Sequence, residues 1–261
     1  MPNALNIARS GLEAQDARLR TISNNLANAN TVGFKRDRAA FETLLYQTTR
    51  PGGAPQGAAA RFGMGLSTGA GVRIAGTERV HSQGGFTVTG NAMDLAIDGE
   101  GLFEVILPDG RAAFTRAGAF TRNAEGLLVT PQGHQVAPGL QIPEGATGIT
   151  IGSDGTVSAQ LPGEAAPVDV GQIALTAFIN PAGLEPMGEN LYLESASSGP
   201  PQQGIAGMNG LGRIRQGSLE SSNVSTVQEL VEMIETQRAY EINSKVISAA
   251  DEMMRYVNQV V

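Results

Sequence analysis

The stretch LNIARSGLEAQDARLRTISNNLANA, residues 5–29, repeats an apolar side chain every seven positions. Its leucines are Leu5, Leu12, Leu19 and Leu26. Three positions after each leucine comes a second row, which includes Ile22. Because an α-helix turns once in about 3.6 residues, this spacing places both rows in one stripe along a helix. The sequence therefore predicts an amphipathic helix over residues 1–30, which ends before Gly33.

A second apolar stripe runs along the other end of the chain. Ser225 followed by Gln228 forms a capping box, a signal for the start of a helix. The apolar positions of the stripe are Val224, Val227, Val231, Ile234, Ile242, Val246, Ala249, Met253, Tyr256 and Val260. In its middle the stripe runs from Ile234 through Arg238 to Ile242, which are two successive steps of four residues. Such a stutter locally unwinds a supercoil. The pattern predicts a helix over residues 224–261.

The middle of the chain has a different character. A connecting region over residues 31–75 contains a Gly/Pro-rich segment, residues 47–71, in which no hydrophobic period is visible. Residues 76–200 consist of short apolar segments separated by turn signals such as Asp109-Gly110, which is typical of an all-β sandwich or barrel-like domain. Residues 201–223 are expected to be a return connection. The predicted fold class is α+β: two terminal helices form a coiled-coil-like bundle, and an all-β central domain is inserted between them.

Composition excludes several classes of function. Acidic residues outnumber basic ones by 25 to 18, giving a net charge of −7, which disfavours binding to nucleic acid. The chain has no cysteine and two histidines, so we expect no metal site, no cofactor and no small-molecule substrate. The first twenty residues lack the apolar core of a secretory signal.

One motif resembles a catalytic one. Residues 65–69, GLSTG, match the G-x-S-x-G of a nucleophile elbow, with Ser67 as the candidate nucleophile. That motif requires a strand before it and a helix after it, and neither flank fits. A triad would also need His81 or His134. The sequence therefore predicts no catalytic residue, although a secreted serine hydrolase and a binding module or adhesin remain as alternatives to be tested.

Polar residues interrupt both stripes. Four asparagines, Asn24, Asn25, Asn28 and Asn30, fall at the end of the first helix although asparagine is a mediocre helix former. Residues 237–245, QRAYEINSK, interrupt the second stripe in the same way. Side-chain amides that bond neighbouring backbones in a packed assembly would explain the asparagines.

These interruptions are also where the chain resembles a known family. SNNLANANTVGFK, residues 23–35, and LVEMIETQRAYEINSKVISAADEMM, residues 230–254, resemble the terminal signatures of the axial proteins of bacterial flagella, which include rod and hook proteins. Residues 76–105 and 114–136 also resemble this family. The chain length and the Gly/Pro-rich segment after Leu44-Leu45-Tyr46 are most similar to the distal rod branch. A proximal rod or hook-type subunit is the alternative.

The resemblance implies a structural protein rather than an enzyme. It implies a subunit that self-assembles into a hollow helical drive shaft, which transmits torque from motor to hook and encloses the export channel. The implied partners are copies of the chain, proximal rod and hook proteins, the surrounding bushing rings and the flagellar type III export apparatus. The implied location is the flagellar basal body, spanning the periplasm after export without a cleaved signal peptide.

The stripes and the signatures together predict the residues of self-assembly. On the N-terminal side these are Leu5, Leu12, Leu19, Ile22, Asn24, Asn25, Leu26, Asn28, Thr31, Gly33 and Phe34. On the C-terminal side they are Val227, Val231, Ile234, Gln237, Arg238, Tyr240, Ile242, Asn243, Val246 and Met253.

Overall fold

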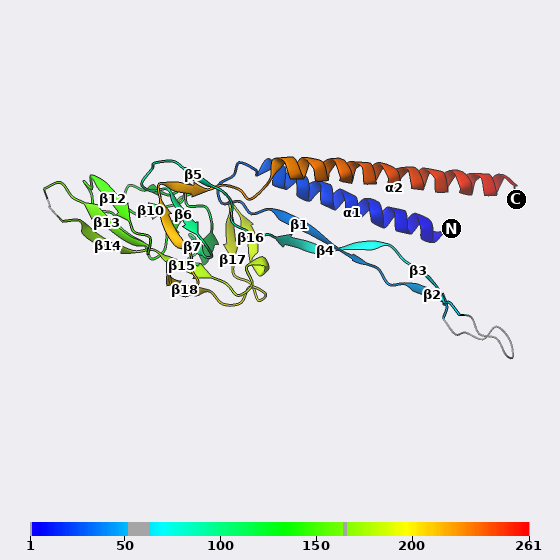
Figure 1. The fold of residues 1–261 in the computed structure, drawn as a ribbon, viewed down its shortest axis with the longest axis horizontal. Coiled ribbons are helices and arrows are strands. Elements are labelled where there is room, and N and C mark those ends of the chain that lie inside the picture. The colour runs from blue at the N-terminus through cyan, green and yellow to red at the C-terminus, as the bar shows by residue number, and fades with distance from the viewer. Residues whose placement is uncertain (1, 52–62, 164–165, 261) are drawn as a thin grey trace. The chain divides into compact units, whose positions relative to one another are not determined.

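A computed structural model of the chain describes residues 2–51, 63–163 and 166–260 (Figure 1). A helix lies at each end of the chain and a β-rich region lies between them, which confirms the predicted α+β class. The chain divides into two compact units. The helical unit comprises Met1–Ala27, Asp37–Glu78 and Ser225–Val261, and the β unit comprises Asn28–Arg36 and Arg79–Val224.

The two helices of the helical unit are α1, Pro2–Ala27, and α2, Thr226–Val260. They lie side by side and antiparallel (Figure 1). The end of α1 is paired with the start of α2, since Asn25 Nδ2 lies 3.2 Å from Glu229 Oε2. Nearer the middle of both helices, Gly11 faces Asn243. The helix predicted over residues 1–30 ends at Ala27, because the three residues that follow form a turn that belongs to the β unit.

The helical unit also contains a long β-hairpin, which we call the hairpin arm. Strand β1, Asp37–Thr43, pairs with β4, Val72–Arg79, and β2, Gln47–Arg50, pairs with β3, Leu66–Thr68. The Gly/Pro-rich segment of residues 47–71, in which the sequence shows no hydrophobic period, contains the paired strands β2 and β3, with Gln47 opposite Thr68. Residues 52–62 of that segment lie outside the described residues.

The β unit holds sixteen of the strands. They are β5 (Phe86–Val88), β6 (Leu95–Asp98), β7 (Leu102–Ile106), β8 (Ala112–Thr115), β9 (Thr121–Arg122), β10 (Leu128–Val129), β11 (Gln135–Val136), β12 (Gly148–Ile151), β13 (Thr156–Gln160), β14 (Val168–Gln172), β15 (Ala174–Ala177), β16 (Glu185–Gly188), β17 (Leu191–Leu193), β18 (Gln202–Ile205), β19 (Arg213–Gln216) and β20 (Ser218–Glu220). A single 3₁₀ turn, η1, covers Pro181–Gly183. A nine-stranded sheet has the order β16-β17-β8-β7-β11-β10-β9, and β15 joins it by pairing with both β7 and β18.

Smaller sheets complete the β unit. β12, β13 and β14 form a three-stranded meander, while β19 pairs with β6 and β20 pairs with β5. The segment expected to be a return connection, residues 201–223, thus contributes three strands to the β unit, whose boundary lies at Val224. Strands late in the sequence complete sheets that early strands begin, a pairing that local sequence does not specify.

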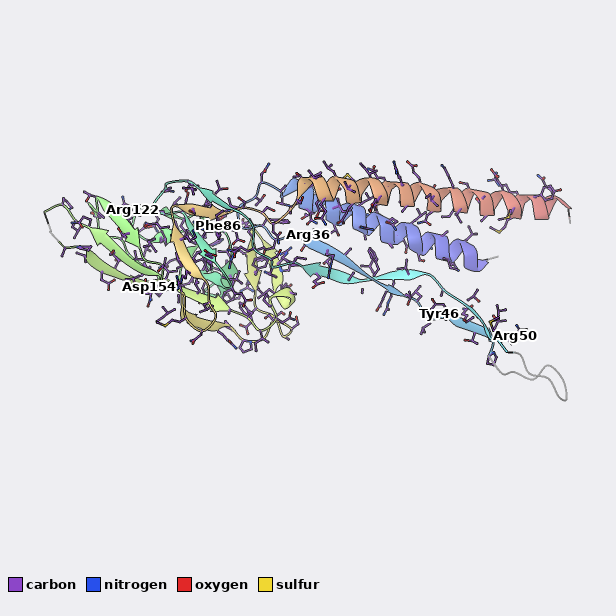
Figure 2. All side chains as sticks on the ribbon, in the orientation of Figure 1. Arg36, Tyr46, Arg50, Phe86, Arg122 and Asp154 are labelled. Atoms are coloured by element: carbon purple, nitrogen blue, oxygen red, sulfur yellow. The ribbon has the colours of Figure 1, made fainter. Side chains whose placement is uncertain are left out.

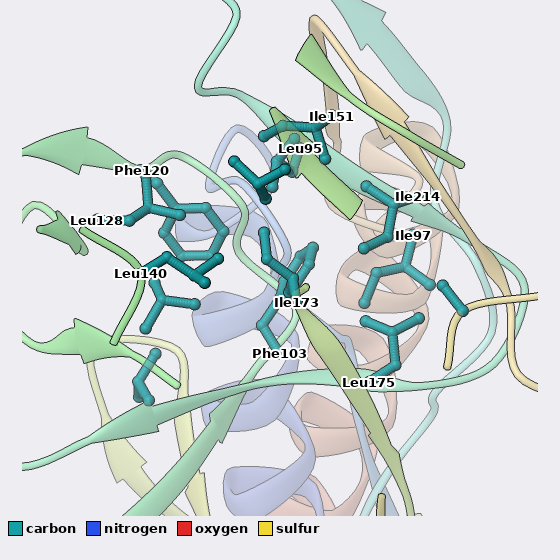
Figure 3. Packing of buried hydrophobic residues seen from close by; sticks show 14 of the residues in the cluster. Leu95, Ile97, Phe103, Phe120, Leu128, Leu140, Ile151, Ile173, Leu175 and Ile214 are labelled. Carbon is teal, nitrogen blue, oxygen red and sulfur yellow. The ribbon is translucent and has the colours of Figure 1, made fainter. Parts of the chain in front are cut away.

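The core of the β unit lies on both sides of β7. Phe103 and Val105 point into the larger cluster, where Phe103 meets Phe120 edge to face with ring centroids 5.2 Å apart (Figure 3). Leu102, one position earlier, belongs to a second cluster, which also contains Phe114. Because successive side chains of a strand point to opposite faces, the apolar run of β7 fills both clusters.

Candidate assembly surfaces

The apolar stripe predicted along α2 is exposed. Val227, for example, retains 72% of its accessible surface. The other large apolar side chains exposed on this helix are Leu230, Val231, Ile234, Tyr240, Ile242, Val246, Met253 and Tyr256. We call this set the α2 stripe. Gln237 and Arg238, which were also predicted to act in assembly, are exposed on the same helix.

A different face of α2 packs against α1. It contains Glu229 and Thr236, both buried, and the half-buried Asn243. The Thr236 hydroxyl bonds the Glu232 carbonyl of its own helix, and Asn243 lies against Gly11, where an added Cβ would come within 3.2 Å of its amide nitrogen. The contact between the helices therefore includes polar and small groups, and it leaves the α2 stripe largely exposed. Exposed apolar surface of this extent on a helix marks an interaction site.

The stripe of α1 is more enclosed. Ile22 and Ala8 are buried, and the four leucines of the heptad, Leu5, Leu12, Leu19 and Leu26, are half-buried. These leucines and the exposed Ile7 are apolar residues of α1 that remain at least partly open to a further partner.

Asn25 shows what one of the four asparagines does. Its side chain is buried, its Nδ2 donates to the carbonyl of Asp37 at 2.8 Å, and its Oδ1 accepts from the amide of Asp37 at 2.9 Å. The amide thus pairs with the first residue of β1 as a neighbouring strand would, and Nδ2 also reaches Glu229. Asn25 therefore bonds a backbone of its own chain, whereas the sequence pattern suggested bonds between packed subunits.

The other asparagines have different environments. Asn24 is exposed on α1, and the Asn28 side chain accepts a bond from the Thr31 hydroxyl at 3.1 Å inside the β unit. Gly33 and Phe34 are buried there as well. Gly33 has a φ of +68°, and a Cβ at this position would lie 2.5 Å from the amide nitrogen of Ala117. These N-terminal signature residues thus pack inside the β unit of their own chain.

A buried ion cluster was not predicted from the sequence. Glu220 Oε1 lies 2.6 Å from Lys35 Nζ, and Glu220 Oε2 accepts from Arg116 Nε. All three side chains are at least 95% buried. Burial would raise the pKa of Glu220, but the charge of Arg116 and the hydrogen bond from Lys35 outweigh burial and hold that pKa below its usual value. Burial lowers the pKa of Lys35, and Glu220 opposes this shift.

His81 lies beside the ion cluster. Burial, with the charges of Lys35, Arg79 and Arg116, lowers its pKa to about 4, so its imidazole is neutral at neutral pH. Its ring is tilted against that of Tyr192 at a centroid distance of 5.8 Å. The only sequence signal for this cluster was the presence of Lys35 at the end of the N-terminal signature.

The hairpin arm exposes a second apolar surface. Leu45 retains 90% of its accessible surface, Tyr46 and Met64 are also exposed, and Figure 2 labels Tyr46 and Arg50 on the arm. The catalytic alternative finds no support on this arm. Ser67 lies in β3, not in a turn between a strand and a helix, and belongs to the helical unit, whereas both histidines belong to the β unit.

Within the described residues, neither helix combines the length and the apolar composition needed to cross a bilayer. Three sequence families match the chain. They are "Flagella basal body rod protein" over residues 5–35, "Flagellar hook protein FlgE/F/G D1 domain" over residues 96–159 and "Flagellar basal body rod FlgEFG protein C-terminal" over residues 215–260.

Individual relatives match over nearly the whole chain. The flagellar basal-body rod protein FlgG of Buchnera aphidicola subsp. Acyrthosiphon pisum is 47% identical over 254 residues, covering 97% of this chain and 98% of the relative. FlgG of Caulobacter vibrioides is 45% identical over 258 residues, covering 98% of both chains. The rod protein FlgF of that same organism is 35% identical, covering 98% of this chain and 96% of FlgF. The chain is thus more similar to the FlgG branch than to the FlgF branch.

The comparisons place the chain in the flagellar basal body and in the axial structure of the flagellum. They also agree with the exposed helical stripe, since a subunit needs surfaces for its neighbours. The chain therefore belongs to the flagellar basal-body rod protein family, in its FlgG branch, and is a structural subunit of the distal rod rather than an enzyme.

Proposed function

We propose that copies of this chain polymerise into a hollow helical tube in which the α2 stripe of each copy is covered by the helices of its neighbours. The observation that carries this proposal is the division of α2 into a face that packs on α1, which contains the buried Glu229 and Thr236, and a largely exposed apolar face, the α2 stripe. In the tube, α1 and α2 of neighbouring copies form a coiled-coil-like bundle that lines the inner wall, and the β units face outward.

The size of the α2 stripe favours a polymer over a simple dimer. Fully burying one large aliphatic side chain contributes about 1.5–3 kcal/mol, so completing the burial of nine that are already partly covered contributes on the order of 10 kcal/mol. Association costs about 4–15 kcal/mol in lost freedom. One such contact is therefore marginal, whereas a lattice gives each subunit several. A contact that repeats without closing into a ring produces a helical filament.

The residues that we propose for these contacts are the exposed members of the predicted sets. They are Asn24, Val227, Val231, Ile234, Gln237, Arg238, Tyr240, Ile242, Val246 and Met253, together with the half-buried Leu5, Leu12, Leu19 and Leu26. The apolar residues of the hairpin arm provide a further contact between copies, which adds stiffness to the tube.

The remaining partners follow from the position of a distal rod subunit. The tube joins proximal rod proteins at one end and the hook at the other, and it transmits torque between them as a drive shaft. It turns inside the surrounding bushing rings, spans the periplasm and encloses the export channel. Its subunits reach the growing tip through the flagellar type III export apparatus without cleavage of a signal peptide.

Electron microscopy of the concentrated protein tests the proposal. The wild type should form hollow tubes, and a double variant, Val231→Glu with Val246→Glu, should remain monomeric because two charges then lie in the α2 stripe. Ser244→Glu is the matched control, since Ser244 is exposed on α2 and is not one of the residues of the α2 stripe. It should form tubes like the wild type. Tubes from the double variant, or no tubes from the wild type at any concentration, would contradict the proposal.

A further inference from the structure

The chain passes four times between the helical unit and the β unit. The passages follow Ala27, Arg36, Glu78 and Val224. Within the β unit, the residues next to these passages belong to three segments: residues 28–36, which have a passage at each end, residues 79–84 and residues 218–224. We call these the junction segments. All of the contacts described below lie within the β unit.

Asn223 binds the junction segments to one another. Its Nδ2 donates to the carbonyls of Val80 and Ser82, at 2.8 and 3.0 Å, and to the Ser82 hydroxyl at 3.0 Å. Its Oδ1 accepts from the amide of Arg36 at 2.7 Å, and its own amide donates to the carbonyl of Phe34 at 3.4 Å. Asn223, which lies beside the passage after Val224, therefore bonds Arg36 and Val80, which lie beside two other passages. In addition, the Val80 amide donates directly to the Arg36 carbonyl at 2.9 Å.

The buried Glu220 also connects the junction segments to one another. Its backbone carbonyl accepts from the amide of Gly33 at 2.8 Å, and its carboxylate accepts from Lys35 in the same segment. The carboxylate also accepts from the amide of Gly84 at 2.8 Å, which ties in the second segment. Arg116 anchors this carboxylate to the sheet, since its guanidinium also donates to the carbonyls of residues 97, 99 and 101.

Lys35 closes the arrangement. Its ammonium donates both to Glu220 and to the carbonyl of Ser82, which also accepts from Asn223. Two sets of side-chain bonds thus join the three segments: those of Asn223, close to the passages in sequence, and those of the buried ion cluster. A satisfied polar network makes a rigid local structure, and in this one the ion cluster is buried and Asn223 is half-buried.

We propose that Asn223 is a positioning residue for load transfer: it fastens the junction segments into one rigid node, so that the passages after Arg36, Glu78 and Val224 cannot bend independently when torque acts on the subunit. The inference rests on the proposed function, because it assumes that the assembled subunit carries torque. The proposed role also explains why the polar Asn223 comes directly before Val224, the first apolar position predicted for the C-terminal helix.

Hydrogen exchange on the full-length chain tests the node itself. In Asn223→Ala the amide of Arg36 loses its acceptor, so its exchange should accelerate at least tenfold, with a similar change at Val80. The amides of Phe103 and Val105 in the core should keep their rates. Asn180→Ala is the matched control, since Asn180 is exposed in the same unit and its side chain makes one bond, to the Ser197 carbonyl. It should leave the exchange at Arg36 unchanged.

Rotation of the flagellum against a viscous load tests whether Asn223 is needed for torque transmission. In cells where the variant chain replaces the wild type, Asn223→Ala should form rods and support rotation at low viscosity. Its rotation should fail at a viscosity that the wild type and Asn180→Ala sustain. Equal exchange at Arg36, or an equal response to viscosity, would overturn the inference. If Asn223→Ala does not fold, the same two measurements are made on Ser82→Ala, which removes only the bond between Asn223 and the Ser82 hydroxyl. We then expect a smaller increase in exchange at Arg36 and a smaller loss of rotation at high viscosity. A wild type that forms no tubes contradicts the proposed function instead.

Discussion

Replacing Glu220 by glutamine removes the negative charge that pairs with both Lys35 and Arg116 in the interior of the β unit. The substitution keeps the size of the side chain and an oxygen that can accept from the amide of Gly84. It leaves two buried cations without a counter-charge: the oxygen that faces Gly84 also faces Lys35, whereas the amide nitrogen replaces the oxygen that accepts from Arg116 Nε. Arg116 keeps its three backbone carbonyls.

The expected loss of stability is large because both cations stay buried. Removing one member of a buried ion pair costs about 3–5 kcal/mol. For a domain of this size each kcal/mol lowers the melting temperature by about 2–4 °C, so Glu220→Gln should lower that of the β unit by on the order of 10 °C. Glu125→Gln is the matched control, because Glu125 is exposed in the same unit, and it should change stability by less than about 0.5 kcal/mol.

Calorimetry of the full-length chain measures the change, and hydrogen exchange at Phe103 and Val105 identifies the transition that belongs to the β unit. Adding Lys35→Met to Glu220→Gln should recover part of the loss, since one of the two unpaired cations is then removed. A melting temperature within about 2 °C of the wild type for Glu220→Gln would refute the reasoning. So would a double variant that is less stable than the two single losses added together.

Three further changes probe other parts of the fold. The folded pKa of His81, about 4, lies below its unfolded value of 6.5, so the stability it contributes is fully present above pH 6.5 and is lost as the pH falls toward 4. The loss should amount to about 3 kcal/mol in the melting curves of the wild type and should be absent from those of His81→Gln. Asn25→Ala removes three side-chain hydrogen bonds and should destabilise the helical unit by about 3 kcal/mol, measured by urea unfolding followed through helical circular dichroism, with exposed Ser23→Ala as the control. Gly33→Ala forces a Cβ against the backbone of Ala117 at a positive φ and should cost the β unit more than about 1 kcal/mol in calorimetry, whereas Gly85→Ala, where a Cβ would meet open space, should not.

The sequence was informative where structure depends on local periodicity. The heptad spacing of Leu5 to Leu26 and the steps from Val227 to Met253 predicted both helices, because a helix places such residues on one face whatever the rest of the chain does. It could not show which face of α2 would meet α1, since the partner surface is set by tertiary packing. Glu229 and Thr236 appeared no better suited to burial than Val231.

The remaining features depend on residues far apart in the chain. Lys35, Arg116 and Glu220 meet only in the folded β unit, so no window of sequence contains their cluster. The same holds for Asn25, whose partner Asp37 lies beyond the end of its helix. The strands of residues 201–223 depend on distant partners as well: β19 pairs with β6 across more than a hundred residues, and a short segment whose partner is unknown resembles a connection in the sequence.

This pairing of early with late strands has a consequence for when the subunit can fold. β5 and β6 find their partners in β20 and β19, and Lys35 finds Glu220, only after residues 213–220 have been made. Contacts of such long sequence separation form slowly, because the intervening chain must first be brought together. The β unit therefore stays open until most of the polypeptide has left the ribosome. That delay suits a subunit that, as proposed, is delivered through the flagellar type III export apparatus.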